Sequence, residues 1–206
     1  MRTVGLDIAE SAVAFGRVLK DEFLAASSLC VGDFMTLPFA DRTFDVSYSL
    51  GALEHRSPGE QSLLLSELTR VTRSYVVLLV PNPESPIFKA MEELEMTRMP
   101  PALVYPEERR HYAVNFGRLA RQNTLEIAEA SAIHIVPPLI IPAIHMTEGA
   151  AQFFSRITQE ALSNWTGSAM TTWLSVEERT AHELKSQYGW FSYAVFRKPG
   201  SSCNTV

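Results

Sequence analysis

The sequence is poor in cysteine, in metal-binding histidine patterns and in positive charge, and each absence narrows the possible functions. Its two cysteines, Cys30 and Cys203, lie far apart and form no CxxC pair, which argues against a disulfide framework and a thiolate metal site. The five histidines show no HxH, HxxxH or HExxH spacing, so we expect no metal site. A formal net charge of −5 provides no basic field for a phosphate backbone, so we expect no nucleic-acid partner.

Long hydrophobic runs are also missing. The longest apolar stretch, IVPPLIIPAI at residues 135–144, is too short and too rich in proline to cross a bilayer. The first ten residues, MRTVGLDIAE, already include acidic side chains, which is not typical of a secretory signal. We therefore expect a cytoplasmic protein without a transmembrane segment. The length of 206 residues suits one domain, which we place at residues 1–200 and follow with a tail at 201–206.

Strand and helix patterns alternate along most of the chain, which predicts an α/β fold built around a parallel sheet. The clearest helix signal is Ser57-Pro58-Gly59-Glu60, a capping box with proline at the first helical position. Residues 82–105 contain several prolines and break the rhythm, so we interpret them as an insertion above the sheet. Strands are expected at 3–7, 29–31, 44–50, 74–81, within 125–136, and at 188–199, and helices at 10–22, from 57, from 106, at 147–163 and at 175–187.

Polar residues close three of the expected strands, and ligands of open parallel sheets bind at the carboxyl ends of strands. Asp7 ends the first strand, Asp33 follows the second, and Leu50-Gly51 closes the third. A carboxylate in such a position can accept two hydrogen bonds from the vicinal hydroxyls of a ribose, as Asp7 is placed to do. A helix-cap or turn role explains an aspartate at a strand end equally well.

The stretch GDFMTLPFADRTFDVSYSLGALEH, residues 32–55, resembles the adenine-side segment of class I S-adenosylmethionine-dependent methyltransferases, particularly the type 11 branch that includes ubiquinone and menaquinone biosynthesis enzymes. The resemblance extends upstream to VGLDIAESAV and implies S-adenosyl-L-methionine as the cofactor. It also implies a Rossmann-like sheet, mostly parallel, with helices on both faces and an antiparallel C-terminal strand. The cofactor-binding residues that it implies are Asp7 at the ribose, Ile8 beside the adenine, Asp33 at the adenine amino group, Phe34 and Met35 against the ring, and Leu50 and Gly51.

One element of that family is missing from these 206 residues, namely the first strand with its GxGxG loop and the following helix. In the family this strand lies at the centre of the sheet, here between the strands expected at 3–7 and 44–50. Its absence predicts two unpaired inner edges, separated by a slot one strand wide, about 4.8 Å. We favour an N-terminally truncated product, and the other hypothesis is a degenerate member whose sheet has closed across the slot.

We therefore expect an enzyme that transfers a methyl group to a small or lipophilic acceptor. His55 and His111 are candidate general bases, although a solvated or packing role suits each of them as well. The segment 82–105 and the PPLIIPAIHM stretch could form an apolar acceptor pocket, with core packing as the equal alternative. The main rival is a noncatalytic binding or regulatory protein, while a nicotinamide-dependent oxidoreductase does not explain GDFMTLPFAD. The sequence does not indicate the oligomeric state.

Overall fold

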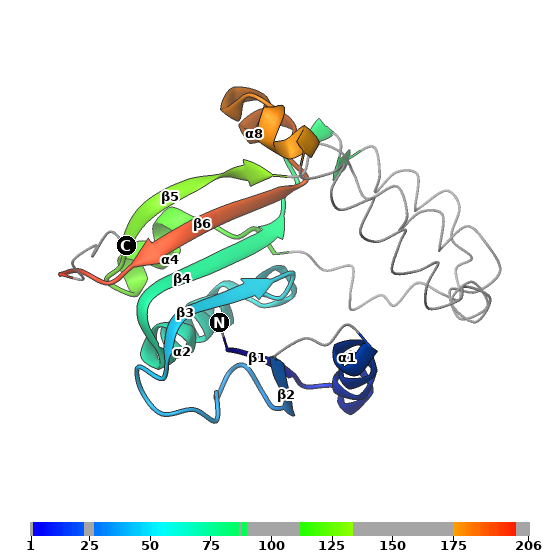
Figure 1. Cartoon of the computed structure of the whole chain (residues 1–206). Coiled ribbons are helices and arrows are strands. Elements are labelled where there is room, and N and C mark those ends of the chain that lie inside the picture. Colours follow the sequence, from blue (N-terminus) through cyan, green and yellow to red (C-terminus); the bar gives the residue numbers. More distant parts are fainter. Residues whose placement is uncertain (1, 23–26, 87, 90–111, 134–174, 201–206) are drawn as a thin grey trace.

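The computed structural model of this chain describes residues 2–22, 27–86, 88–89, 112–133 and 175–200 (Figure 1). Most of the expected insertion, His111, the helix expected at 147–163 and the tail lie outside these residues. The described elements, in chain order, are β1 (Thr3–Asp7), α1 (Glu10–Glu22), β2 (Ser27–Val31), β3 (Phe44–Leu50), the 3-10 helix η1 (Leu53–His55), α2 (Pro58–Val71), β4 (Thr72–Pro81), α4 (Phe116–Gln122), β5 (Glu126–Ile133), α8 (His182–Tyr188) and β6 (Phe191–Arg197).

The strands form two sheets, and the pairing confirms the expected α/β fold. β1 pairs parallel with β2, and the larger sheet has the order β3-β4-β6-β5. Within it β3 and β4 are parallel, while β6 runs antiparallel to both β4 and β5. The C-terminal strand is therefore the antiparallel one, as the sequence predicts.

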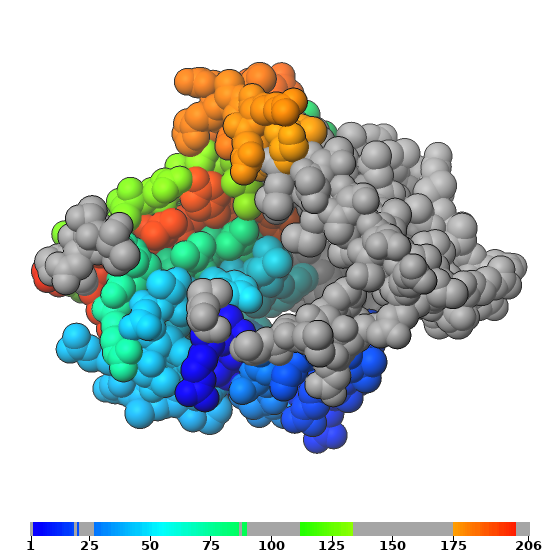
Figure 2. Space-filling view, viewed as in Figure 1, coloured from blue at the N-terminus to red at the C-terminus, as the bar shows by residue number. Residues whose placement is uncertain are grey.

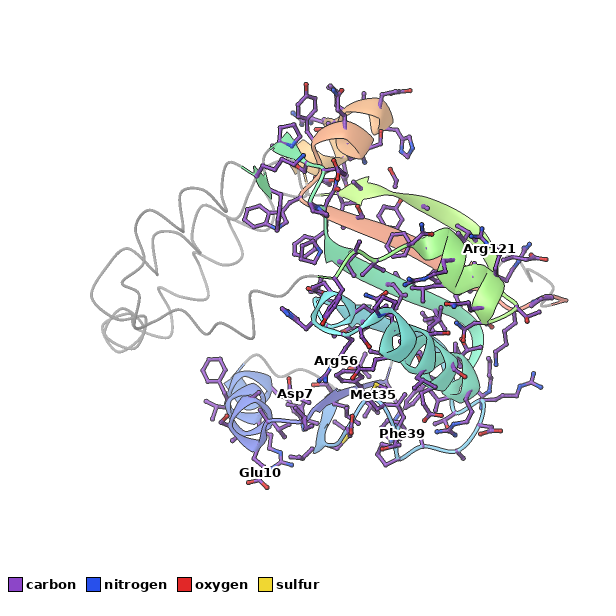
Figure 3. All side chains as sticks on the ribbon, turned by 180° about the vertical axis from the view of Figure 1, so that it is seen from behind. Asp7, Glu10, Met35, Phe39, Arg56 and Arg121 are labelled. Carbon is purple, nitrogen blue, oxygen red and sulfur yellow. The ribbon has the colours of Figure 1, made fainter. Side chains whose placement is uncertain are left out.

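The two sheets are not joined by strand pairing in the described residues. Among the described residues, β1 and β3 each pair on one edge alone, and no strand lies between them. Figures 1 and 3, seen from opposite sides, place β1, β2 and α1 together at the β3 side of the larger sheet. In the space-filling view these blue N-terminal residues lie next to the cyan ones (Figure 2). In the described residues β1 and β3 are thus not paired with each other, and the expected slot between them stays a prediction.

The apolar face of β3 is exposed. Val46 is 51% exposed, Tyr48 72% and Leu50 56%. The period-two alternation correctly predicts a strand, but the serines between these residues face α2, because Ser47 pairs with the buried Val76 and accepts a hydrogen bond from Thr72 at 2.6 Å. The apolar side chains consequently point to the opposite face of the sheet.

The core lies between the larger sheet and the helices α2 and α4, which cover the same face (Figure 3). The capping box begins α2 as expected, since the Glu60 carboxylate accepts the Ser57 N–H at 2.9 Å. Removing one buried leucine from such a core costs about 2–5 kcal/mol, so this layer anchors the fold. The buried core residues are Leu53, Leu64, Leu65, Leu68, Val76, Leu78, Val80, Leu119, Ala120, Ala194 and Phe196.

Two expected helices differ in the structure. The helix expected from Pro106 is wrong at residues 112–115, which are not helical, and α4 begins only at Phe116. The reason is Asn115, whose extended backbone ends the preceding segment and whose side chain accepts the Arg118 N–H at 2.8 Å. The helix expected at 175–187 is divided into a turn of helix at 175–179 and α8, because Ala181 is extended, with ψ of 143°.

Candidate functional site

Asp7 and Asp33 lie at the carboxyl ends of two neighbouring parallel strands. Asp7 is paired with Val31, the last residue of β2, and the Gly32 N–H donates to the Asp7 carbonyl at 2.9 Å. Asp33 is therefore the second residue after the end of β2. Glycine suits position 32 because a Cβ there would lie 2.8 Å from the Leu6 side chain, so the chain can pass closely over β1.

Both carboxylates also stabilise their own turns. Oδ1 of Asp7 accepts the Ala9 N–H at 2.8 Å, and Oδ1 of Asp33 accepts the Met35 N–H at 2.8 Å. These are Asx turns, so the turn role that the sequence leaves open is present at both positions. Within the described part of the chain, neither Oδ2 has a hydrogen-bond partner, and both aspartates are exposed. Each aspartate thus combines a fixed backbone with a second oxygen that a ligand could use.

The residues after Asp33 connect the site to the core. Phe34 and Met35 are half-buried and pack against the buried cluster beneath α2. The guanidinium of Arg56 lies over the Phe34 ring, 5.0 Å from its centroid, in cation–π geometry. Figure 3 labels Asp7, Met35 and Arg56 in one region of the molecule, between the smaller sheet and α2. Ile8, the other residue expected beside the adenine, is 60% exposed next to Asp7.

The third strand end contributes Leu50 and Gly51. Gly51 has a φ of +68°, which favours glycine, and its N–H donates to the Leu79 carbonyl at 3.1 Å. This turn leads directly into η1, where Leu53 is fully buried. The three strand ends expected to form the site therefore belong to both sheets, two to the smaller and one to the larger.

Sequence reasoning missed the buried carboxylate of Glu54, which is 4% exposed. Its Oε1 lies 3.8 Å from Nε2 of His55, one of the two candidate bases, whose side chain is 36% exposed. Glu54 is therefore placed beside one of the two candidate bases. The signal in the sequence was a charged residue directly after an apolar turn, but only the fold shows that it is buried.

Gln61 is the second residue that the sequence reasoning missed. It is fully buried, and its amide nitrogen donates to the carbonyls of Leu53 at 3.2 Å and Arg56 at 3.0 Å. Its oxygen accepts from Nη2 of Arg118 at 2.7 Å, which ties η1, α2 and α4 together. Its position in the sequence indicated burial, because Gln61 lies on the same face of α2 as the buried Leu64, Leu65 and Leu68.

The described residues contain neither a membrane-spanning helix nor a metal-binding cluster. None of the helices among them is long and apolar enough to cross a bilayer. Likewise, they bring together no group of three or more His, Cys, Asp or Glu side chains that could hold a metal ion.

Comparison with known proteins identifies the fold and the domain. A family model described as a methyltransferase domain matches residues 1–80, whereas no curated protein sequence matches the chain. A methyltransferase-fold protein from Bacillus halodurans is 17% identical with a TM-score of 0.54, over 97% of this chain and 84% of that one. Magnesium protoporphyrin IX methyltransferase from Synechocystis PCC 6803, solved with bound S-adenosylhomocysteine, is 13% identical with a TM-score of 0.52, over 95% of this chain and 63% of that one.

A third similar structure is the cyclase SpnF, which is 16% identical with a TM-score of 0.55, over 97% of this chain and 67% of that one. Likeness at this level of identity shows the shared fold, and the sequence match to a methyltransferase domain covers residues 1–80. Residues 1–80 thus match a methyltransferase domain in sequence, and the chain shares its fold with solved methyltransferases.

Proposed function

We propose that this chain binds S-adenosyl-L-methionine and transfers its methyl group to a small or lipophilic acceptor. The observation that carries the proposal is the placement of Asp7 and Asp33 on adjacent ends of the parallel strands β1 and β2. A ribose offers two neighbouring hydroxyl donors and an adenine offers an amino donor, so two carboxylates at the ends of neighbouring parallel strands suit an adenosine.

In this proposal Asp7 accepts the ribose hydroxyls and Asp33 accepts the adenine amino group. Ile8, being exposed, can cover one side of the adenine, while Phe34 and Met35 form the wall behind it. Leu50 and Gly51 approach from β3, where the positive φ of Gly51 turns the backbone toward η1. In this proposal the adenosine would thus contact residues of both sheets.

Methyl transfer makes limited demands on the protein's acid–base groups. The sulfonium supplies an activated methyl group, so holding the acceptor in line with it can provide much of the acceleration. Where the acceptor atom carries a proton, His55 is the described candidate to take it, with Glu54 beside it at 3.8 Å. His111 remains the second candidate base.

The preference for a small or lipophilic acceptor rests on charge. A net charge of −5 disfavours a polyanionic acceptor, because no basic surface would offset its phosphates. The names of the structural neighbours do not select the acceptor, since one names magnesium protoporphyrin IX, another a possible histamine N-methyltransferase and a third small RNA. We further propose a cytoplasmic location, in keeping with the low cysteine content.

The alternative is a noncatalytic binding or regulatory protein, or an inactive truncated product. The observation that favours it is the missing GxGxG motif, because backbone amides at such a loop would hold the methionine half of the cofactor. The resemblance places the strand that leads into that loop between β1 and β3, and these two strands do not pair with each other in the described residues. SpnF, named as a cyclase, also illustrates that this fold serves other chemistry.

Calorimetric titration with S-adenosylhomocysteine tests the proposal. Micromolar binding supports an enzyme, whereas millimolar or absent binding supports the noncatalytic alternative. The variant Asp33→Asn keeps an oxygen for the Met35 N–H but replaces the second oxygen by a donor, so binding should weaken about 10- to 100-fold, the value of one charged hydrogen bond. Asp45→Asn is the matched control, since Asp45 is 83% exposed and pairs with Arg73 outside the site.

The same titration on a chain lengthened by any upstream coding sequence separates the remaining alternatives. If an added strand fills the slot, binding should tighten and the exposed Tyr48 should become protected from solvent. Equal binding by both chains, with Tyr48 still exposed, would argue against a missing strand.

A further inference from the structure

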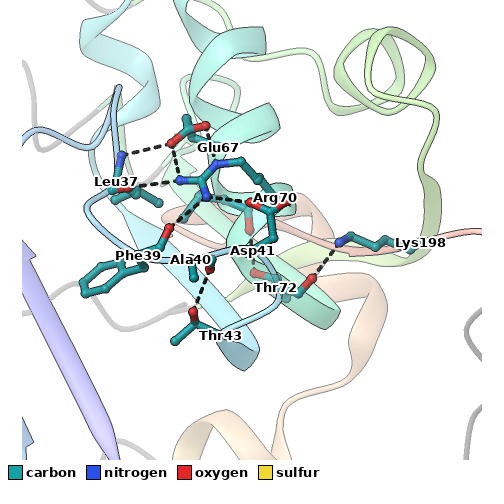
Figure 4. A network of polar contacts seen from close by, with 10 residues as sticks. Leu37, Phe39, Ala40, Asp41, Thr43, Glu67, Arg70, Thr72 and Lys198 are labelled. Atoms are coloured by element: carbon teal, nitrogen blue, oxygen red, sulfur yellow. Dashed lines mark hydrogen bonds and ion pairs between the residues drawn. The ribbon is translucent and has the colours of Figure 1, made fainter.

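We infer that Arg70 and Glu67, on α2, are positioning residues that hold the adenine-side loop, residues 32–43, in its binding conformation. The inference rests on the function proposed above. It concerns side chains that lie outside the expected cofactor contacts and that no motif of the sequence singles out. Their role follows from a network of hydrogen bonds between α2 and the loop (Figure 4).

Arg70 binds the loop with both terminal nitrogens of its guanidinium. Nη2 donates to the Leu37 carbonyl at 3.0 Å, and Nη1 donates to the Phe39 carbonyl at 2.8 Å. Nη1 also donates to Oδ1 of Asp41 at 2.8 Å. Three positions of an irregular loop are thus fixed by one rigid, planar group, which a lysine ammonium cannot reproduce.

Glu67 lies on the preceding turn of the helix and binds both Arg70 and the loop. We call Arg70 and Glu67 together the clamp. The two oxygens of Glu67 accept from Nε and Nη2 of Arg70 at 2.8 and 2.9 Å, a bidentate pair. One of them, Oε2, also accepts the Leu37 N–H at 3.0 Å, so both backbone groups of Leu37 are held. The hydrogen bond from Arg70 holds the pKa of Glu67 below its usual value and that pair raises the pKa of Arg70, so both groups stay charged.

The clamp matters because the loop is the connection between the two sheets. At its start, Gly32 is bonded to Asp7 of the smaller sheet, and at Leu37 it is bonded to α2 of the larger one. Asp33, Phe34 and Met35 lie between these two attachment points. With no strand pairing between β1 and β3 in the described residues, releasing Leu37 would let the adenine-side residues shift relative to Gly51 and Arg56.

The network is sheltered enough to hold a conformation. The side chains of Arg70 and Glu67 are 32% and 23% exposed, and the loop contacts are mostly backbone carbonyls and an amide. An ordinary exposed ion pair contributes little, and Arg73 with Asp45 is such a pair, 51% and 83% exposed. Arg73 therefore provides a control that differs from Arg70 in its contacts and not in its charge.

The test compares Arg70→Gln, Arg70→Lys and Arg73→Gln with the unmodified chain. Two quantities are measured on each protein: S-adenosylhomocysteine affinity by calorimetry, and hydrogen exchange at the amides of Met35 and Leu37. We expect Arg70→Gln to weaken binding about tenfold or more and to speed exchange at Leu37, because binding must then reorder the loop. Arg70→Lys should lose affinity as well, because lysine keeps the positive charge but not the planar guanidinium. Arg73→Gln should change neither the affinity nor the exchange rate.

Each outcome decides the matter. A folded Arg70→Gln that binds as tightly as the unmodified chain, whatever its melting temperature, would show a purely structural role and overturn the inference. Should Arg70→Gln fail to fold, the same comparison is made with Arg70→Lys. If the unmodified chain does not bind, the proposed function fails first, and unchanged exchange at Leu37 in the variant would then independently overturn the clamp.

Discussion

Replacing Gln61 by leucine should lower the free energy of unfolding by about 3 kcal/mol and loosen η1, which the Gln61 amide holds. The two side chains have similar volume, so the change removes polar contacts without leaving a large cavity. Gln61 is fully buried and makes three hydrogen bonds with carbonyl or guanidinium groups. The estimate depends on which of those groups keeps another partner.

The three groups are affected to different extents. The Leu53 carbonyl keeps the Arg56 N–H at 3.0 Å, so its loss is that of an ordinary hydrogen bond, about 0.5–1.5 kcal/mol. The Arg56 carbonyl loses its described partner, at about 1–3 kcal/mol, and the Arg118 guanidinium loses a charged bond, at about 1.5–3 kcal/mol. Burying the more apolar leucine returns roughly 1–2 kcal/mol, which leaves a net loss near 3 kcal/mol.

Urea unfolding, followed by far-UV circular dichroism, measures the change. Ser62→Ala is the control, because Ser62 is the next residue of α2 and accepts a single bond, from Asn123 at 3.2 Å. Ser62→Ala should lower the free energy of unfolding by about 1 kcal/mol or less. A double-mutant cycle with Arg118→Met should give a coupling of about 1–3 kcal/mol between Gln61 and Arg118. A loss below 1 kcal/mol for Gln61→Leu, with an unchanged urea dependence, would refute the view that this amide organises η1.

Two further predictions concern stability. Gly189→Ala should lower the free energy of unfolding in urea by about 1–3 kcal/mol, because the new Cβ would lie 2.6 Å from the Lys185 carbonyl oxygen and 2.7 Å from the Ile133 backbone nitrogen. Gly59→Ala is the control, because nothing lies within 4 Å of a Cβ at that position, and equal effects of the two substitutions would contradict the steric argument. In acid, the lowered pKa of Glu67 means that its stabilisation is complete above the ordinary value of 4.5 and is lost as the pH falls through the lower folded value. Unfolding measured between pH 7 and pH 3 should therefore show a shallower acid loss for Glu67→Gln, and parallel curves would count against the clamp.

Local patterns in the sequence predict most of the elements, for identifiable reasons. The capping box at Ser57 specifies where α2 begins, because its hydrogen bonds join residues three apart. The continuous apolar run of β4 and the aromatic run of β6 suit strands covered by other elements, and both strands occur. The predictions were wrong where a single polar or extended residue divided a helical pattern, at Asn115 and at Ala181.

The candidate site was predictable in part. Asp7 and Asp33 end strands whose parallel pairing follows from the β-α-β pattern, so their neighbouring positions could be expected. Gln61 could not be assigned, because its partner Arg118 lies on α4, 57 residues later in the chain, and the burial of Glu54 is visible only in the fold. Arg70 looks like any charged residue of a helix until the loop folds against it.

The sequence by itself determined the order of strands and helices, the carboxylates at the strand ends and the lack of a glycine-rich loop, since each is a matter of neighbouring residues. Only the tertiary structure decided that β6 pairs between β4 and β5, that the sheets stay apart between β1 and β3, and that α2 holds the adenine-side loop. The physical reason is that backbone pairing and buried polar contacts join residues distant in the chain, and their energy depends on burial, which no local pattern records.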